Sequence, residues 1–578
     1  MAQTPKTEVL DPAAVALLKA LFESNPQAGL EWDFSQPGRM AALGDGRLTV
    51  KVERGRLKAL DLSGRRLAEV RLVELSSLMS VNLAGAELER ITAHNLPNLV
   101  FLGLDRIRCP SGGGLSLTRL PRLRRLTMSG AVCGQLQMIA GLVSLKELEL
   151  ESCSIDDLGF LERLKGLKRL LLDRNALTDV HSLIGLTALE ELRLEDNEIE
   201  DLEPLTSLKK LRRLELAGNQ LEDFSPLNDL SGLFELGLGR TKVDTLDWAG
   251  GLANLKRLDL SENSLRDIDH LSELAELEIL LLGGNDVSDV RPLTALSQLA
   301  VLDLSGNPVV DVAPLTALSS LRELDLSRIG LQLDPEPLKA MTSLRRLDLG
   351  SRHVADLSPL SGLVELTRLG LCDNRIVDLS PLSGLKNLRR LDLSLNRIED
   401  LSPLSALPDL QELDVSDNLI VDAAPLSLVF GLERLDLSGN DVVDLSPLGQ
   451  LKGLARLEAK PRSALSKRPT SSFDGGPEPE RGVVAVRRLG DDGAESEQTL
   501  VFHYRHRFPL SEGRHEFRDP ASDRVSRFVV ENVFSTVETT PAYREIPEAL
   551  GAEAQEALQL MDQIFSLLSF NPTKRSTH

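Results

Sequence analysis

The chain has 578 residues, too many for one ordinary hydrophobic core, so several domains or a repeat array are expected. Aromatic residues make up only 3% of the sequence although hydrophobic residues make up 42%, which predicts a core of aliphatic side chains, chiefly leucine. The formal net charge of −21 argues against nucleic acid and anionic membrane as partners and favours a basic protein surface.

Residues 1–56 come before any repeat and are expected to form an N-terminal cap on the first coil. Asp11 and Pro12 are suited to the start of a helix that runs to about Glu23, with apolar residues along one face. The alternating stretch LTVKV (48–52) predicts a strand that leads into the first repeat.

No export signal and no membrane span is predicted. The best apolar run near the N-terminus, residues 13–18, is too short for a signal peptide and is followed by Lys19. No stretch approaches the length of a helix that crosses a bilayer. The four cysteines are too few for a disulfide framework, which agrees with a reducing compartment. The cytoplasm is therefore the expected location.

From Leu57 onward the sequence repeats itself, with a dominant period of 22 residues, as in LTRLGLCDNRIVDLSPLSGLKN (366–387) and LRRLDLSLNRIEDLSPLSALPD (388–409). Leucines at unit positions 1, 4 and 6 fit a short strand whose residues 4 and 6 face inward. Apolar residues at positions 11, 14, 17 and 20 bring the chain back around the far side. The units begin at Leu57, Leu78, Leu99, Leu123, Leu145, Leu167, Leu189, Leu211, Leu233, Leu255, Leu277, Leu299, Leu321, Leu344, Leu366, Leu388, Leu410 and Leu432, with a partial unit at Leu454.

Two polar positions define the turns of each unit. Position 9 is usually Asn, as in Asn197 and Asn396, and a short amide there can bond backbone groups of neighbouring coils that would otherwise be buried unpaired. Position 13 is Asp, often followed by Ser-Pro at positions 15 and 16, as in Asp378, Ser380 and Pro381. Because Ser is a good N-cap and Pro suits the first helical position, a single tight helical turn is predicted to start there.

The repeat LxxLxLxxNxIxDLxPLxxL resembles the leucine-rich-repeat family, in its 22-residue class, which includes the internalins of bacterial surfaces and a regulatory subunit of the type-one protein phosphatase. The resemblance covers residues 57–460 and implies an α/β solenoid: a horseshoe or arc with a parallel sheet on the concave side, which binds proteins, and short helical turns on the convex side. The export signal and wall-anchoring tail of internalins are not recognised here, and the aromatics of the phosphatase-binding relatives are nearly absent. A bacterial, cytoplasmic adaptor is the interpretation that agrees with these departures.

Positions 3, 5 and 7 of each strand are expected to face solvent on the concave side. Position 5 is mostly acidic and position 3 is often Arg, which predicts either a solvated face of mutually neutralising charges or a charge-patterned docking surface. Ile279, Leu281 and Val301 place three aliphatic residues in this charged face, and such patches often mark protein contacts unless a flanking segment covers them. The predicted partner-binding residues are Ile279, Leu281, Val301, Asp259, Asp303 and Asp325.

The sequence contains none of the common catalytic or cofactor motifs: no phosphate loop, no GxGxxG, no HExxH, no GxSxG and no CxxC. The protein is therefore predicted not to be an enzyme and to use no cofactor or metal. Cys372 is expected to face the concave solvent as a free thiol. Trp248 replaces the usual Pro on the convex side, where it is either packed against a neighbour or exposed.

After Leu457 the period stops, and residues 461–482 are polar and rich in Pro and Gly, which predicts a linker. Residues 483–578 are expected to form a small α+β region. Strands are predicted at 483–489, 499–508 and 527–537. Residues 547–570 predict a helix whose apolar positions recur at alternating four and three, which suits docking or self-association through a short coiled coil.

His503, His506 and His515 lie near acidic residues in this region, which fits either a metal or acid–base site or ordinary surface histidines. His503 and His506 would point to opposite faces of one strand, which favours surface histidines.

Two functions remain. The first is an adaptor whose solenoid captures a protein partner. The alternative is an effector or enzyme in which the solenoid targets a catalytic unit within 483–578. Because stacking contacts between repeats are local, residues 1–460 are expected to fold alone as an elongated monomer.

Overall fold

The structure is a computed structural model that describes residues 12, 15–17, 19, 49–53, 56–107, 114–131, 136–329, 334–351, 353–460, 482–489, 495–504, 513–518 and 525–532. The chain forms two compact units, Met1–Asp303 and Leu304–His578, each of which is described by itself. The division falls inside the predicted solenoid, and the predicted boundaries at residues 56 and 460 stay predictions. Within the described residues, no helix has the length and apolar character needed to cross a membrane.

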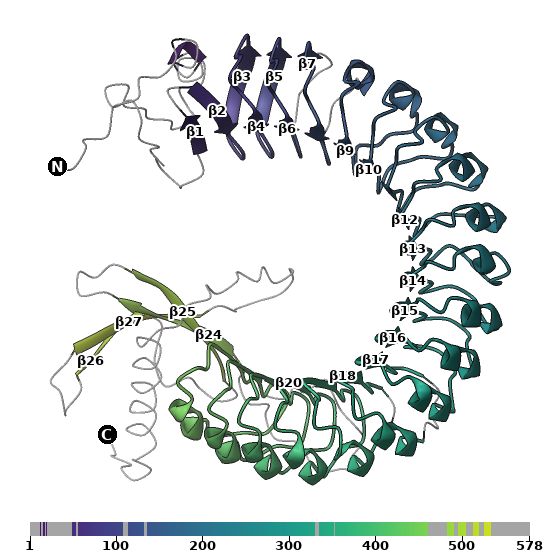
Figure 1. Cartoon of the computed structure of the whole chain (residues 1–578). Coiled ribbons are helices and arrows are strands. Elements are labelled where there is room, and N and C mark those ends of the chain that lie inside the picture. Colours follow the sequence, from purple (N-terminus) through teal and green to yellow (C-terminus); the bar gives the residue numbers. More distant parts are fainter. Residues whose placement is uncertain are drawn as a thin grey trace, which may run out of the picture. The chain divides into compact units, whose positions relative to one another are not determined.

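The first unit is a stack of coils, each of which contributes one short strand to a parallel sheet along the inner side (Figure 1). At its start, β1 (Thr49–Glu53) pairs antiparallel with β2 (Arg56–Asp61), which confirms the predicted entry strand. The strands that follow in the sheet are β4 (Ser80–Asn82), β6 (Phe101–Gly103), β8 (Arg125–Thr127), β9 (Glu147–Glu149), β10 (Arg169–Leu171), β11 (Glu191–Arg193), β12 (Arg213–Glu215), β13 (Glu235–Gly237), β14 (Arg257–Asp259), β15 (Ile279–Leu281) and β16 (Val301–Asp303). From β4 onward each strand spans unit positions 3 to 5.

The leucines of the repeat form the core, as predicted. In one coil Leu192 and Leu194, at positions 4 and 6, are both fully buried, and so are their counterparts in the neighbouring coils. Burial of aliphatic surface along the stack therefore supplies the main favourable contribution to folding.

The first three coils differ from the prediction on their return side, which is the side opposite the inner strands. Instead of helical turns, they carry a second parallel sheet of β3 (Arg66–Val73), β5 (Glu87–His94) and β7 (Leu115–Thr118). The two coils that contain β3 and β5 lack the Asp-x-Ser-Pro sequence, and apolar residues such as Ile91 and Ala93 alternate with polar ones. Without a capping aspartate and a proline, an alternating segment favours a strand over a tight helical turn.

From the fourth coil onward the return side carries short 3₁₀ turns, which confirms the predicted helical turns. In the first unit they are η2 (Leu136–Gly141), η3 (Gly159–Leu161), η4 (His181–Leu183), η5 (Glu203–Ser207), η6 (Ser225–Asp229), η7 (Ala249–Gly251), η8 (Asp269–Glu273) and η9 (Arg291–Ala295). Trp248, which precedes η7, is packed rather than exposed: its ring stacks on Phe224 with 6.1 Å between centroids, and its Nε1 donates to the carbonyl oxygen of Thr245 at 3.0 Å.

The residue that caps these turns is the aspartate at position 13, not the serine at position 15 as predicted. Ser225 is the first residue of η6, and its backbone N–H donates to Oδ1 of Asp223 at 2.8 Å. The hydroxyl of Ser225 donates to the other oxygen of Asp223, also at 2.8 Å. An aspartate two residues ahead of an N–H reaches it in an Asx turn, so the serine becomes part of the turn that the aspartate holds.

Where position 9 is asparagine, its side chain joins the coil to the one before it, as predicted. Nδ2 of Asn197 donates to the carbonyl oxygens of Leu172 in the previous coil and Leu194 in its own, at 3.1 and 3.0 Å. Its Oδ1 accepts the backbone N–H of Leu177 at 3.2 Å. The buried turn thus keeps its backbone groups paired. We refer to the position-9 asparagines as the asparagine ladder.

The second unit continues the same construction. Its parallel strands are β17 (Glu323–Asp325), β18 (Arg346–Asp348), β19 (Arg368–Gly370), β20 (Arg390–Asp392), β21 (Glu412–Asp414), β22 (Arg434–Asp436) and β23 (Arg456–Glu458). Its 3₁₀ turns are η10 (Ala313–Ala317), η11 (Glu336–Ala340), η12 (Ser358–Leu360), η13 (Ser380–Gly384), η14 (Ser402–Ala406), η15 (Ala424–Leu428) and η16 (Ser446–Gln450).

Beyond the repeats lies a four-stranded antiparallel sheet of β24 (Gly482–Leu489), β25 (Glu495–Tyr504), β26 (Gly513–Arg518) and β27 (Val525–Asn532), in the order β25-β24-β27-β26. Three of these strands overlap the predicted ones, and β26 was not predicted. The predicted helix at 547–570 and the predicted linker, apart from Gly482, lie outside the described residues.

Candidate protein-binding surface

The register of β14, β15 and β16 brings the predicted aliphatic residues together on the strand face. Ile279 lies between Arg257 and Val301 on the neighbouring strands. Leu281 lies between Asp259 and Asp303 in the same way. Five of the six predicted partner-binding residues therefore share one surface, which we call the aliphatic patch: Ile279, Leu281 and Val301 with Asp259 and Asp303. The sixth, Asp325, lies on β17 in the second unit.

Each residue of the aliphatic patch is half-buried rather than fully exposed. Parallel strands lie only about 4.8 Å apart, so side chains at equal positions cover one another's flanks. Leu280, between Ile279 and Leu281 on β15, is fully buried, which shows that its two neighbours point to the opposite face of the strand. The Oδ1 atom of Asp259 accepts hydrogen bonds from the N–H and the hydroxyl of Ser261, at 2.9 and 2.5 Å.

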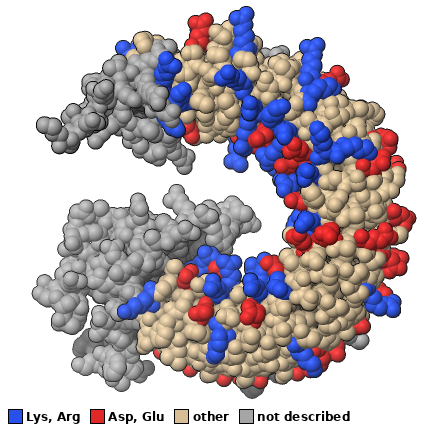
Figure 2. All heavy atoms as spheres, viewed as in Figure 1, with Lys and Arg blue, Asp and Glu red and all other residues tan. Residues whose placement is uncertain are grey.

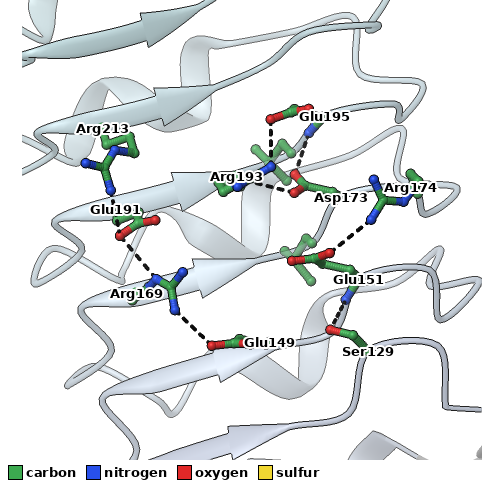
Figure 3. A network of polar contacts seen from close by, with 12 residues as sticks. Ser129, Glu149, Glu151, Arg169, Asp173, Arg174, Glu191, Arg193, Glu195 and Arg213 are labelled. Carbon is green, nitrogen blue, oxygen red and sulfur yellow. Dashed lines mark hydrogen bonds and ion pairs between the residues drawn. The ribbon is translucent and has the colours of Figure 1, made fainter. Parts of the chain in front are cut away.

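Charges of alternating sign cover the strand face before the aliphatic patch. At position 3 the sequence runs Glu147, Arg169, Glu191, Arg213 and Glu235 on β9 to β13, which we call the charge ladder. Figure 3 shows its middle part, where Glu191 lies between Arg169 and Arg213. Glu191 contacts Arg169 at 3.1 Å and Arg213 at 3.3 Å, and Arg213 contacts Glu235 at 2.5 Å. The hydrogen bond from Arg213 lowers the pKa of Glu235. From Arg169 to Glu235 each charge of the ladder thus pairs with a neighbour within it, which agrees with the interpretation of this stretch as a solvated face.

The alternation stops at Arg257. In the described part of the chain no carboxylate forms an ion pair with this guanidinium, which acts on Glu215 and Glu235 only at longer range. Arg257 is the register neighbour of Ile279. The aliphatic patch therefore begins where the internal neutralisation of the strand face ends.

Two carboxyl groups lie deeper in the strand face. Asp173 is fully buried; its Oδ1 accepts the N–H of Glu195 at 2.9 Å (Figure 3). Its Oδ2 lies 2.9 Å from Nε of Arg193, in a geometry that makes no hydrogen bond. Burial raises the pKa of Asp173 to about 6. Burial, together with the charge of Glu195, raises the pKa of Glu215 to about 7.

These two groups predict that the protein gains stability as the pH falls from 8 to about 5. Their folded-state pKa values lie above the unfolded ones, so the folded chain binds more protons in this window and stability falls as pH rises through it. We expect a gain of about 1–2 kcal/mol in unfolding free energy, allowing for screening at Glu215. Chemical denaturation of wild type across this range is the measurement.

The double variant Asp173→Asn, Glu215→Gln is the control and is expected to show little of this gain. Below about pH 4 the trend reverses, because the pKa of Asp289 is lowered to about 2, mainly by the hydrogen bond from Arg291, and stability is lost as such groups are protonated. A double variant with the wild-type slope between pH 8 and 5 would assign the effect to other groups.

Two apolar residues on the strand face, Phe101 and Leu171, are not among the predicted partner-binding residues. Phe101 is half-buried at position 3 of β6, with the guanidinium of Arg125 5.8 Å from its ring centroid. Leu171, on β10, holds position 5 of its repeat; it lies between Glu149 and Arg193 and is only 3% exposed. The repeat numbering alone places both, so the signal was present in the sequence. Only Phe101 is accessible enough to contact a partner.

Cys372 does not face open solvent as predicted. It is half-buried, and a Cβ atom built on Gly350 would lie 2.9 Å from its sulfur. Burial, reinforced by Asp392 and Asp348, raises the pKa of its thiol to about 11. The thiol therefore stays protonated and weakly nucleophilic at neutral pH.

Of the three C-terminal histidines, the two that the structure describes lie on different strands. His503 lies on β25 and His515 on β26, the two edge strands, with β24 and β27 between them. His506 lies outside the described residues. Over the part of the chain that the structure describes, no group of three or more His, Cys, Asp or Glu side chains is arranged to hold a metal ion.

Comparison with known proteins identifies the repeat. The family described as "Leucine Rich repeats (2 copies)" matches residues 187–229, 364–405 and 386–428, and the family "Leucine rich repeat" matches 236–287. No curated protein matches the chain.

Three solved structures of bacterial proteins are similar to this chain in sequence. A leucine-rich-repeat protein of Leptospira interrogans is 25% identical and matches over 58% of this chain and 90% of its own, with a TM-score of 0.53. An internalin of Listeria monocytogenes is 26% identical over 55% of this chain and 88% of its own, with a TM-score of 0.43. A second Listeria internalin, internalin C2, is 30% identical over 40% of this chain and 83% of its own, with a TM-score of 0.27.

Proposed function

The chain is a leucine-rich-repeat protein of the internalin-like class, and on this basis we propose that it is a scaffold that captures a protein partner on the strand face around β14 to β16. Proteins of this family typically bind other proteins without catalysing a reaction, and the coils here leave a continuous face of strand residues in each unit. The finer role proposed is that of an adaptor in the bacterial cytoplasm, supported by the free thiols of Cys153 and Cys372.

The observation that carries the proposal is the aliphatic patch. Ile279, Leu281 and Val301 interrupt a strand face that is mostly charged, and they lie side by side in the register of the sheet. A hydrophobic centre surrounded by polar groups is the usual anatomy of a protein interface. Arg257 and Asp259 on β14 and Asp303 on β16 supply a polar rim that can fix the orientation of a partner.

Affinity capture followed by mass spectrometry, with full-length protein and residues 1–460 in parallel, tests where the partner binds. We expect both chains to retain the same partner from the native host, because the proposed surface lies within the repeats and contacts between coils are local. Circular dichroism checks that the shorter chain is folded. A partner that a folded 1–460 chain fails to retain would place the binding site in the C-terminal region instead.

A further inference from the structure

The second unit orders its charges differently from the first. On β18, β19 and β20 the residues at position 3 are Arg346, Arg368 and Arg390, which are direct register neighbours. Arg345 and Arg389 precede two of these strands, and all five side chains are exposed. We call these residues, namely Arg345, Arg346, Arg368, Arg389 and Arg390, the arginine row. Figure 2 shows basic side chains gathered along the inner side of the second unit with acidic side chains beside them.

On the strands of the second unit, repeat position 5 carries charges of the opposite sign. We call this the aspartate row; it runs over Asp325, Asp348, Asp392, Asp414 and Asp436, with Gly370 in place of an aspartate on β19. Unlike the charge ladder, each row repeats one sign on neighbouring strands. Burial and the neighbouring aspartates raise the pKa of Asp348, which reflects this repetition.

The arginine row is only partly neutralised within the protein. Arg346 pairs with Glu323 at 2.7 Å and Arg390 with Glu412 at 3.3 Å. Arg345, Arg368 and Arg389 have no carboxylate at ion-pair distance within the described residues. Three exposed guanidinium groups on adjacent coils thus keep their hydrogen-bond donors available to a ligand.

The aspartates two residues along the strands are held away from the arginines. Oδ1 of Asp392 accepts the N–H and the hydroxyl of Ser394, at 3.0 and 2.7 Å. Asp348 accepts the N–H of Gly350 at 2.9 Å, and its carboxylate lies over Gly370, where a Cβ atom would be only 2.5 Å from Oδ2. Because backbone hydrogen bonds fix these carboxylates, they do not fold onto the arginines, and both rows stay open to an outside partner.

We propose that the arginine row binds an acidic segment of a protein partner, with the aspartate row meeting basic residues beside that segment. Two parallel rows of opposite sign match a polypeptide, which can carry both signs side by side. A nucleic acid carries one sign along its whole backbone, and the aspartate row, about 7 Å further along the strands, would repel it. The inference rests on the proposed function, extends it to the strand face of the second unit and uses none of the residues of the aliphatic patch.

Selection from a random peptide library displayed on phage, with the full-length protein as bait, tests the proposal. We expect the recovered peptides to be enriched in Asp and Glu at least about threefold over the library, because fixed charges select complementary partners. The triple variant Arg345→Glu, Arg368→Glu, Arg389→Glu is expected to lose this enrichment. A matched control, Arg375→Glu, Arg397→Glu, Lys452→Glu, changes the net charge equally at exposed residues outside the arginine row and is expected to keep it.

The outcomes separate the alternatives. Absence of acidic enrichment, or enrichment that survives in the arginine-row variant, overturns the proposal. Wild-type binding of a labelled oligo(dT) of about 20 nucleotides that the same variant weakens would assign the row to nucleic acid instead. The variant Leu281→Asp is expected to retain acidic enrichment, so failure of the aliphatic patch is distinguishable from failure of the arginine row. If the triple variant melts below wild type, Arg368→Ala alone is expected to lower the enrichment by about half.

Discussion

Replacing Asn418 by valine is expected to lower the unfolding free energy of the second unit by about 3–5 kcal/mol. Asn418 belongs to the asparagine ladder and is fully buried. Its Nδ2 donates to the carbonyl oxygens of Leu393 at 2.8 Å and Val415 at 3.1 Å, and its Oδ1 accepts the N–H of Ile398 at 3.0 Å. Valine fills nearly the same volume but leaves these backbone groups buried without partners, at a cost of about 1–3 kcal/mol for each group that water cannot reach.

The protein itself supplies the control for this substitution. Thr241 occupies position 9 of another coil, where its hydroxyl donates to the carbonyl oxygen of Leu238 at 2.6 Å. Asn418→Thr keeps one such bond and is therefore expected to cost about half as much as Asn418→Val. Denaturant unfolding monitored by circular dichroism measures both variants. Equal losses for threonine and valine would show that packing volume, not hydrogen bonding, accounts for the effect.

Most of the fold could be predicted from the period of the repeat. Leucines at positions 4 and 6 gave the strands and the core because neighbouring coils repeat the same burial, so each position has one environment. Two errors remained, one in coils that depart from the others and one at the ordinary turns. The segments of β3 and β5 lack the Asp-x-Ser-Pro sequence and form strands. At the ordinary turns Asp223, rather than Ser225, provides the cap, because the serine already lies within the turn.

For the candidate surface, the sequence was enough to predict which residues are neighbours across the strands, but not how deeply each side chain is buried. Counting unit positions was enough to place Ile279 beside Val301, and the same count would have found Phe101. Counting cannot give the degree of burial, which depends on the side chains of the two flanking coils. Leu171 and Leu281 both hold position 5, yet Leu171 is buried and Leu281 is half-buried. The raised pKa of Asp173 has the same origin, because it follows from burial that only the assembled coils create.

Leu281→Asp is expected to weaken capture of the partner at least about tenfold, a loss of roughly 1.4 kcal/mol. An aliphatic side chain at the centre of an interface contributes more than charges at its rim, since exposed ion pairs are worth only about 0–1 kcal/mol. The new carboxylate would also lie between Asp259 and Asp303, and the three negative charges would repel an acidic group of the partner. Asp259→Asn, a rim substitution on the neighbouring strand, is expected to change affinity by less than about threefold.

Leu171→Asp is the matched test of whether Leu281 belongs to a binding surface or to the core. Both leucines hold position 5 of their repeats, and the substitution is identical, but Leu171 is only 3% exposed. An aspartate there would be buried beside Glu149, while Arg193 on its other side is already paired with Asp173 and Glu195. Leu171→Asp should therefore lower the melting temperature strongly. Leu281→Asp should shift it by only a few degrees, since its side chain already reaches solvent in the free protein. Unchanged capture by Leu281→Asp, or a melting temperature as low as that of Leu171→Asp, would contradict the assignment of the aliphatic patch as the centre of the interface.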